Sequence, residues 1–128
     1  DYKWKIFAVM ITNGTADGDN GYLFNYMFTD LSSNAAVEEF LGEIKLRSIY
    51  YPAVDIAASD KILTLSTCTY EFDEARLVIM ARMVRPGEST DVNVDNLRYN
   101  ANPKYPQAYY DEKGLSNPYK SYTKWYPS

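Results

Sequence analysis

Two neighbouring apolar runs, residues 61–68 and 76–84, constrain the fold of this chain more than any other feature. Both are rich in β-branched and aliphatic residues, which favours β-strands. The segment from Thr69 to Ala75 suits a hairpin loop, so the two strands are predicted to pair antiparallel. In that pairing Cys68, which ends the first strand, faces Arg76, which begins the second. Directly opposed residues have Cβ atoms about 4.5–5.5 Å apart, so the arginine reaches any group bound at the sulfur.

Further elements are predicted before this hairpin. Residues 5–12 form a continuous apolar run, which is typical of a strand buried on both faces. Residues 22–28 are predicted as a short strand or an extended segment. A helix is predicted from Ser33 to about Ser48, with Ser32 or Ser33 as its cap and Pro52 marking the exit from this region. Its apolar residues recur at three- and four-residue spacing and form one packing face: Val37, Phe40, Leu41 and Ile44.

The last third of the chain differs from the rest in composition. Pro86-Gly87 ends the apolar pattern, and residues 87–128 are predicted to form a tyrosine-rich extension packed on the domain of residues 1–86. Seven of the 13 tyrosines follow residue 98, and four Xaa-Pro pairs there favour turns or extended backbone. Surface-anchoring rings are favoured over a sugar-binding platform. The chain is therefore predicted to be mainly β, with one or two helices.

Composition excludes several classes of function. The chain has 128 residues, a formal net charge of −4, no histidine and one cysteine. An internal disulfide is impossible, and the usual zinc sites and the serine triad lack their histidine, so we expect no metal and no cofactor. The negative charge argues against nucleic acid as a partner. No apolar run approaches the ~18 residues of a transmembrane span. The acidic pairs Glu38-Glu39 and Asp73-Glu74 are assigned to the solvated surface.

Cys68 is the strongest candidate for chemistry. A lone cysteine is most often a small buried hydrophobe, but Cys68 stands at the polar end of a strand, after Ser66 and Thr67. A thiolate is an effective nucleophile without assistance, and a nearby guanidinium favours the thiolate over the thiol. Arg76 can also hydrogen-bond an oxyanion that develops during attack on a carbonyl. The competing interpretation of Arg76 is a solvated hairpin arginine. Ser66 and Thr67 are candidates for substrate binding.

The run Thr64-Leu65-Ser66-Thr67-Cys68, followed at a short interval by Ala75-Arg76-Leu77-Val78, resembles the active-site strands of the sortases, and of class B in particular. The predicted helix ahead of the cysteine strand is similar to the insertion that marks class B. The resemblance covers residues 1 to about 86 and implies the C-terminal part of a sortase-like β-barrel. It assigns Cys68 as the nucleophile and Arg76 as the residue that steadies the oxyanion or the substrate backbone.

The resemblance also implies an activity and a location. Sortases are cysteine transpeptidases on the outer face of the Gram-positive cell membrane. They cleave a C-terminal sorting motif of a secreted protein through a thioester, which an amine of a peptidoglycan precursor then resolves. Class B implies a motif of the Asn-Pro type, with pilin assembly as the other possibility.

One departure from the family separates the hypotheses. Sortases carry an essential histidine upstream of the cysteine, and this chain has none. We therefore expect the C-terminal portion of a longer sortase, inactive alone and ordered only with the missing portion or with a second copy. The alternatives are a non-catalytic cell-surface binding or scaffold domain that uses the aromatic tail, and a β-rich domain with an inert cysteine.

Overall fold

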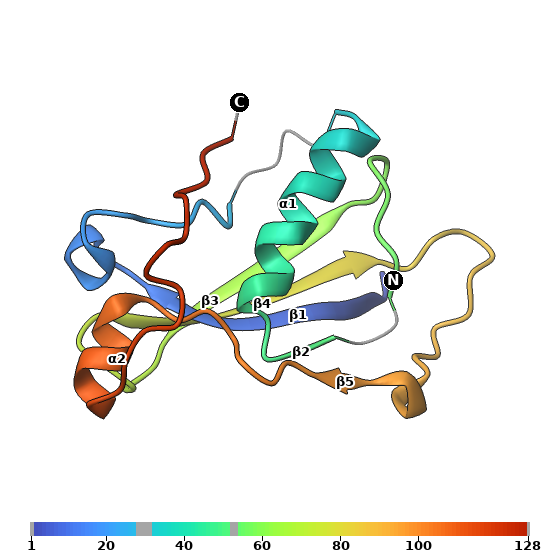
Figure 1. Ribbon diagram of the computed structural model, residues 1–128. Helices are drawn as coiled ribbons and strands as arrows, with labels where there is room; N and C mark the ends of the chain where they lie inside the picture. The colour runs from blue at the N-terminus through green and yellow to red at the C-terminus, as the bar shows by residue number, and fades with distance from the viewer. Residues whose placement is uncertain (1, 28–31, 52–53, 128) are drawn as a thin grey trace.

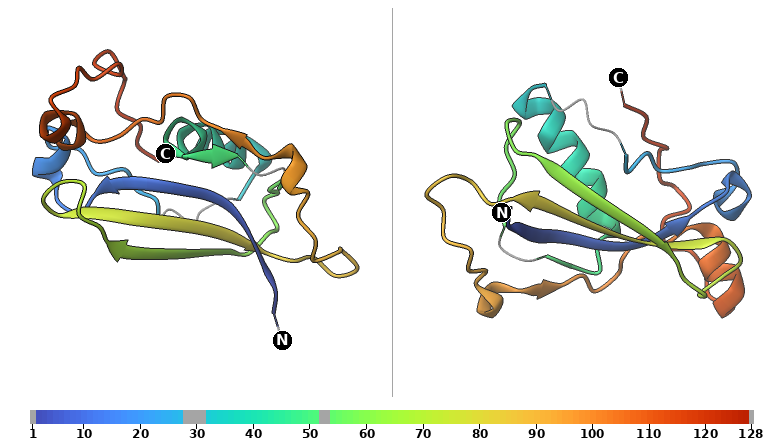
Figure 2. Two further views of the ribbon diagram at one scale, coloured as in Figure 1. Left: turned by 90° about the horizontal axis from the view of Figure 1, so that it is seen from below. Right: turned by 180° about the vertical axis from the view of Figure 1, so that it is seen from behind.

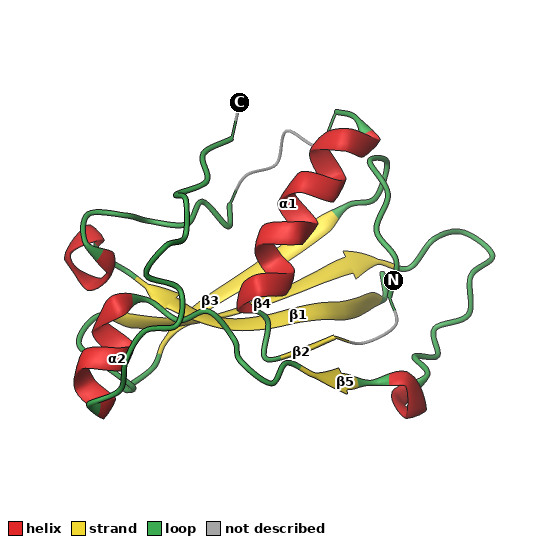
Figure 3. Ribbon diagram, in the orientation of Figure 1, coloured by secondary structure: helices red, strands yellow, loops and turns green. Residues whose placement is uncertain are grey.

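The computed structural model describes residues 2–27, 32–51 and 54–127. These residues form a mainly β fold with two α-helices, as the sequence predicts (Figure 1; Figure 3). The main sheet has three antiparallel strands in the order β1-β4-β3, namely β1 (Trp4–Asn13), β4 (Ala75–Met83) and β3 (Ile62–Cys68). The short strands β2 (Tyr50–Tyr51) and β5 (Arg98–Tyr99) form a second antiparallel sheet. Two 3-10 turns are also present, η1 (Ala16–Asp19) and η2 (Val94–Asn96).

Strand β4 is the centre of the main sheet. It pairs with β3 in the predicted antiparallel hairpin, where Ile62 lies opposite Arg82 and Cys68 opposite Arg76. On its other side it pairs with β1, so Arg76 also lies opposite Thr12. A β-bulge between Ile6 and Ala8 shifts the register of β1. The strands predicted at residues 5–12, 61–68 and 76–84, and the pairing of the hairpin, are thus confirmed to within a residue or two at each end.

Helix α1 (Asn34–Arg47) covers one face of the main sheet (Figure 1). It begins at the predicted cap, because the backbone amide of Ala36 donates a 3.1 Å hydrogen bond to Ser33 Oγ. The predicted apolar stripe is buried apart from Leu41, which is half-buried at the edge. The helix packs on side chains that β1 and β4 direct to this face, and together they form the main core: Phe7, Ala8, Met10, Phe40, Ile44, Val78 and Met80.

The opposite face of the main sheet is apolar and partly exposed. The register places three rows of residues there: Ile6–Ala81–Leu63, Val9–Ile79–Leu65 and Ile11–Leu77–Thr67. Ile6 is 43% exposed and Leu65 is 55% exposed, whereas Ile11 is covered by a second cluster that includes Phe72 and Tyr105. Seen from behind, β3 and β4 lie in front of α1 (Figure 2, right). Residues 5–12, predicted to be buried on both faces, are therefore largely but not completely buried.

The tail contains a helix that the sequence did not predict. Helix α2 (Gln107–Lys113) follows Pro106 and ends at Gly114, whose φ of 67° is the left-handed conformation that glycine adopts readily. The sequence pattern predicts no helix or strand after residue 87, so α2 and β5 add to the predicted elements. Further on, Trp125 packs against the main core, with its ring centroid 5.9 Å from that of Phe40. The division of the chain at residue 86 stays a prediction.

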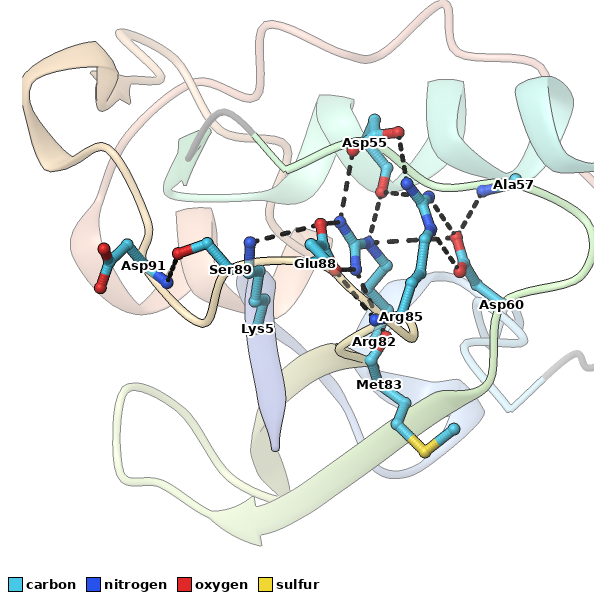
Figure 4. A network of polar contacts seen from close by, with 10 residues as sticks. All are labelled: Lys5, Asp55, Ala57, Asp60, Arg82, Met83, Arg85, Glu88, Ser89 and Asp91. Carbon is cyan, nitrogen blue, oxygen red and sulfur yellow. Dashed lines mark hydrogen bonds and ion pairs between the residues drawn. The ribbon is translucent and has the colours of Figure 1, made fainter. Parts of the chain in front are cut away.

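An ionic network joins the far end of β4 to two loops (Figure 4). The side chain of Arg82 is 1% exposed, and its two terminal nitrogens donate to Glu88 at 2.7 and 2.8 Å. Its Nε donates to the backbone oxygen of Asp55 at 2.6 Å. Arg85 binds Asp60 at 2.7 Å, and Lys5 of β1 lies 3.3 Å from Glu88. The network thus fixes the 55–60 loop against the end of the sheet.

The resemblance to sortases implies part of a β-barrel, but the sheet does not close into a barrel within the ranges that the structure describes. Residues 22–27 are extended or in a turn and form no strand, while residue 28 and Pro52 lie outside the described residues. In the described part of the chain, no helix has both the length and the apolar character needed to cross a membrane.

Candidate active site

Cys68 and Arg76 are brought together as the sequence predicts. Cys68 is the last residue of β3, its side chain is exposed, and it is a free thiol. The register pairs it directly with Arg76, the second residue of β4. Directly paired residues on neighbouring strands direct their side chains to the same face of the sheet. The nucleophile candidate and the guanidinium therefore share one face at the end of the hairpin.

The hairpin loop fixes the separation between these two residues. The amide of Thr69 donates to the backbone oxygen of Ala75 at 3.2 Å, and the amide of Ala75 donates to that of Phe72, also at 3.2 Å. The Phe72 side chain is buried in the second cluster and anchors the loop. Glu74 adopts a left-handed φ of 62°, which closes the turn just before β4 begins. Both strand ends are held by backbone contacts that do not depend on the reacting side chains.

The guanidinium of Arg76 lies over the backbone of Gly14. A Cβ atom at Gly14 would lie 2.9 Å from Arg76 Cζ and 2.9 Å from the Glu74 carbonyl oxygen, so the glycine permits this close approach. The Gly14 amide itself donates to Glu74 O at 2.7 Å. The sequence analysis missed this contact. The Asn13-Gly14 turn was visible in the sequence, but nothing in it pointed to Arg76.

Among the residues that the structure describes, Arg76 makes two polar contacts, which leave most of its N–H donors for other partners. Nη2 lies 3.4 Å from Glu74 Oε2, and Nη1 donates to the backbone oxygen of Ala75 at 3.1 Å. The side chains of this ion pair are 28% and 53% exposed, and exposed pairs of this kind contribute about 0–1 kcal/mol. A guanidinium has five N–H donors, so a change of rotamer can turn several of them toward a bound oxyanion.

The two other predicted site residues lie on opposite faces. Ser66 shares the face of Cys68 because side chains alternate along a strand, and its Oγ lies 3.2 Å from the Tyr26 hydroxyl. Thr67 lies opposite Leu77 on the other face. Ser66 is therefore within the same surface as the thiol, whereas Thr67 is not. A role of either residue in substrate binding stays a prediction.

The surface beside the hairpin loop is acidic. A shallow groove of about 710 Å³ runs between this loop, η1 and α2, and five carboxylates line it: Asp17, Asp73, Glu74, Asp111 and Glu112. Glu74, the ion-pair partner of Arg76, lines this groove, whereas Cys68 does not. Within the described ranges, no group of three or more His, Cys, Asp or Glu side chains is placed to hold a metal ion.

Comparison with known proteins identifies relatives for part of the chain. No family model matches it. It is 34% identical over 86 residues to sortase B of Listeria monocytogenes and 33% identical over 86 residues to sortase B of Staphylococcus aureus. Each alignment covers 66% of this chain and 32% of the relative, so the chain spans about a third of the length of these proteins.

Solved structures give similar matches. A crystal structure of Staphylococcus aureus sortase B has a TM-score of 0.49 and 30% identity, and the match covers 66% of this chain and 37% of that one. A Bacillus anthracis protein described as similar to sortase B has a TM-score of 0.47 and 35% identity, over 65% of this chain and 33% of that one. Over the 86 residues that align, about two thirds of its length, this chain is related in sequence to the class B sortases.

Proposed function

We propose that the protein containing this chain is a sortase-type cysteine transpeptidase, with Cys68 as its nucleophile and Arg76 as the residue that stabilises the oxyanion. One observation carries the proposal. An exposed thiol at the end of β3 lies directly opposite an arginine with unused donors, in a chain related to the class B sortases. Chemistry of this kind requires both groups on one face, which the register provides.

The first half of the reaction forms a thioester. The Cys68 thiolate attacks a backbone carbonyl carbon in the sorting motif of a secreted protein, and the carbon–oxygen π electrons move onto the oxygen. Arg76 donates hydrogen bonds to this oxyanion. When the carbonyl re-forms, the carbon–nitrogen bond breaks and the leaving amine takes up a proton. The chain has no histidine, so we assign this proton to a histidine in a part of the protein outside these 128 residues.

The second half transfers the acyl group. An amine of a cell-wall precursor attacks the thioester carbon, a new amide bond forms, and the thiolate of Cys68 is released after the amine loses a proton. The product is a protein joined covalently to the cell wall. We place this reaction on the outer face of the Gram-positive cell membrane, with the sorting-motif peptide and the precursor amine as the two substrates.

The test uses a sorting-motif peptide and the full-length protein that contains this chain. Cys68→Ala abolishes turnover and removes the acyl adduct from the intact mass of the protein. Arg76→Ala lowers turnover by about 10²–10³-fold, the usual effect of losing one oxyanion donor. The matched control is Arg98→Ala, which removes an exposed arginine from β5 and leaves turnover unchanged. Normal cleavage of the peptide by the Cys68→Ala protein would refute the proposal.

The alternative role as a non-catalytic binding or scaffold domain stays a prediction. It would use the aromatic tail, but Tyr122 and Trp125 pack against the main core. The Trp125 ring nitrogen also donates to Glu39 at 2.6 Å. No observation in the described residues favours a free aromatic platform there. Titration with cell-wall glycan, followed by the fluorescence of Trp125, tests this role directly.

A further inference from the structure

A small polar cavity lies away from the hairpin, between the loop after η1 and the C-terminal tail. Its volume is about 150 Å³, and its lining residues come from three segments, 19–22, 104–107 and 117–124. In Figure 1 the tail leaves α2 and crosses the segment that follows η1, where Lys124 Nζ donates to the backbone oxygen of Asn20. None of the proposed catalytic residues lines the cavity. Its chemistry is therefore independent of Cys68 and Arg76.

Lys104 provides a buried positive charge at the cavity. The residue is 5% exposed, and burial lowers the pKa of its ammonium, an effect to which the nearby charge of Arg47 adds. Its Nζ lies 3.8 Å from Asp19 Oδ2, which is longer than a hydrogen bond, and 4.4 Å from the centre of the Tyr122 ring. Asp19 already has a partner, since its Oδ1 accepts a 2.9 Å hydrogen bond from the backbone amide of Gln107. An ammonium has three donors, and an acceptor at short range would satisfy it better than this long pair.

Two further lysines make the mouth of the cavity positive. Lys120 and Lys124 are exposed, and Lys124 Nζ donates to the backbone oxygen of Asn20 at 3.1 Å. Asp19 is the one acidic residue among the lining residues, against three lysines. The chain as a whole has a net charge of −4, so these three lysines form a positive region on a protein that is negative overall. Such a local excess of one sign attracts ligands of the opposite sign.

Neutral polar groups complete the lining. The side-chain amide of Asn117 donates to that of Gln107 at 3.0 Å, which fixes the tail against the start of α2. Both side chains are half-buried, and amides of this kind add directional hydrogen bonds to the charge of the lysines. A water molecule occupies about 30 Å³ of the liquid, so a cavity of about 150 Å³ has room for one small group of a few heavy atoms.

We propose that this cavity binds an oxyanion, the carboxylate or phosphate group of a larger molecule, between Lys104 inside and Lys120 and Lys124 at the mouth. An oxygen of the anion accepts a short charge-assisted hydrogen bond from Lys104, which the long contact to Asp19 does not provide. The two outer lysines hold the remaining negative charge in a partly solvated position. The proposal does not depend on the transpeptidase activity.

The test is an NMR titration of the full-length protein, with the backbone amides of Asn117 and Lys120 as reporters. Inorganic phosphate and acetate are added separately, and sodium chloride at equal ionic strength serves as the screening control. We expect saturable shifts with phosphate, acetate or both, and none with chloride. A response to only one of the two anions identifies which oxyanion the cavity takes.

Variants separate a site from general charge attraction. Lys120→Gln with Lys124→Gln removes two exposed charges without disturbing the core, and we expect the apparent Kd to rise at least about fivefold. Lys3→Gln with Lys113→Gln is the matched control, since it removes the same charge from exposed positions elsewhere and leaves the Kd unchanged. Lys104→Met abolishes binding where the spectrum shows a folded protein. Shifts that never saturate, that chloride reproduces, or that survive the Lys120 and Lys124 substitutions would overturn the proposal.

Discussion

Replacement of Arg82 by methionine tests how the buried ionic network contributes to stability. The Arg82 side chain is 1% exposed and makes close contacts with Glu88 and with both the backbone and the carboxylate of Asp55. Methionine fills part of the same space but provides no donor. The substitution therefore leaves the Asp55 backbone oxygen and the Glu88 carboxylate, whose side chain is 22% exposed, without their guanidinium, while the Asp55 carboxylate, 77% exposed, stays open to water.

The expected cost follows from the partners that remain. A hydrogen-bonding group left without its donor in a partly buried position costs about 1–3 kcal/mol. We expect Arg82→Met to reduce the free energy of unfolding by this amount, measured by denaturant unfolding with circular dichroism. Arg98→Met is the matched control. Arg98 has the same side chain, but it is exposed in β5, where water replaces its contact with the backbone oxygen of Leu97.

Two results would refute this reasoning. Equal destabilisation by Arg82→Met and Arg98→Met would show that burial does not decide the cost. An unchanged or increased stability of Arg82→Met would show that methionine packing fully offsets the lost ion pairs, as replacement of a whole buried network can do. The triple variant Lys5→Met with Arg82→Met and Glu88→Gln separates the two contributions, since it removes Glu88 together with both of its cationic partners and should recover part of the loss.

Three further predictions concern the core, the pH dependence and the hairpin. Phe40→Ala removes a ring that is 2% exposed and should cost about 3–5 kcal/mol of unfolding free energy by the same assay; a loss below about 1 kcal/mol would contradict the packing described. The hydrogen bond from Arg85 lowers the pKa of Asp60. The ionised Asp60 carboxylate therefore stabilises the folded protein at pH values above its ordinary pKa of about 3.9, and this stabilisation is lost as the pH falls below that value. Asp60→Asn should remove this part of the acid dependence in unfolding curves measured at several pH values. Gly14→Ala places a Cβ atom 2.9 Å from Arg76 Cζ, so turnover of a sorting peptide should fall while alkylation of the thiol by iodoacetamide keeps its rate; equal effects on both would point to a general distortion.

The hairpin and helix α1 could be predicted because their signals are local. An apolar run, a short polar loop and a second apolar run determine both strands and their pairing, and this pairing alone places Cys68 opposite Arg76. The serine cap and the apolar spacing likewise determine α1. The resemblance to class B sortases rests on the same residues.

Features that depend on distant segments could not be predicted. In the sequence, Arg82 is a charged residue inside an apolar run, and no local pattern indicates that its guanidinium binds Asp55 and Glu88. The approach of Gly14 to Arg76 depends on how the end of β1 pairs with β4. Helix α2 was missed because seven residues with two adjacent tyrosines give no clear helical period, and packing of these rings stabilises it instead.

The ionic network has a consequence for the kinetics of folding. Lys5 and Asp55 lie far along the chain from the segment that carries Arg82 and Glu88, so the contacts of Lys5 and Asp55 with this segment form only after the strands have assembled. An incomplete set leaves a desolvated charge without a partner, which disfavours compact states that differ only slightly from the native one. Interactions completed after the transition state slow unfolding more than they speed folding. The network therefore governs how long the native arrangement persists once it has been reached.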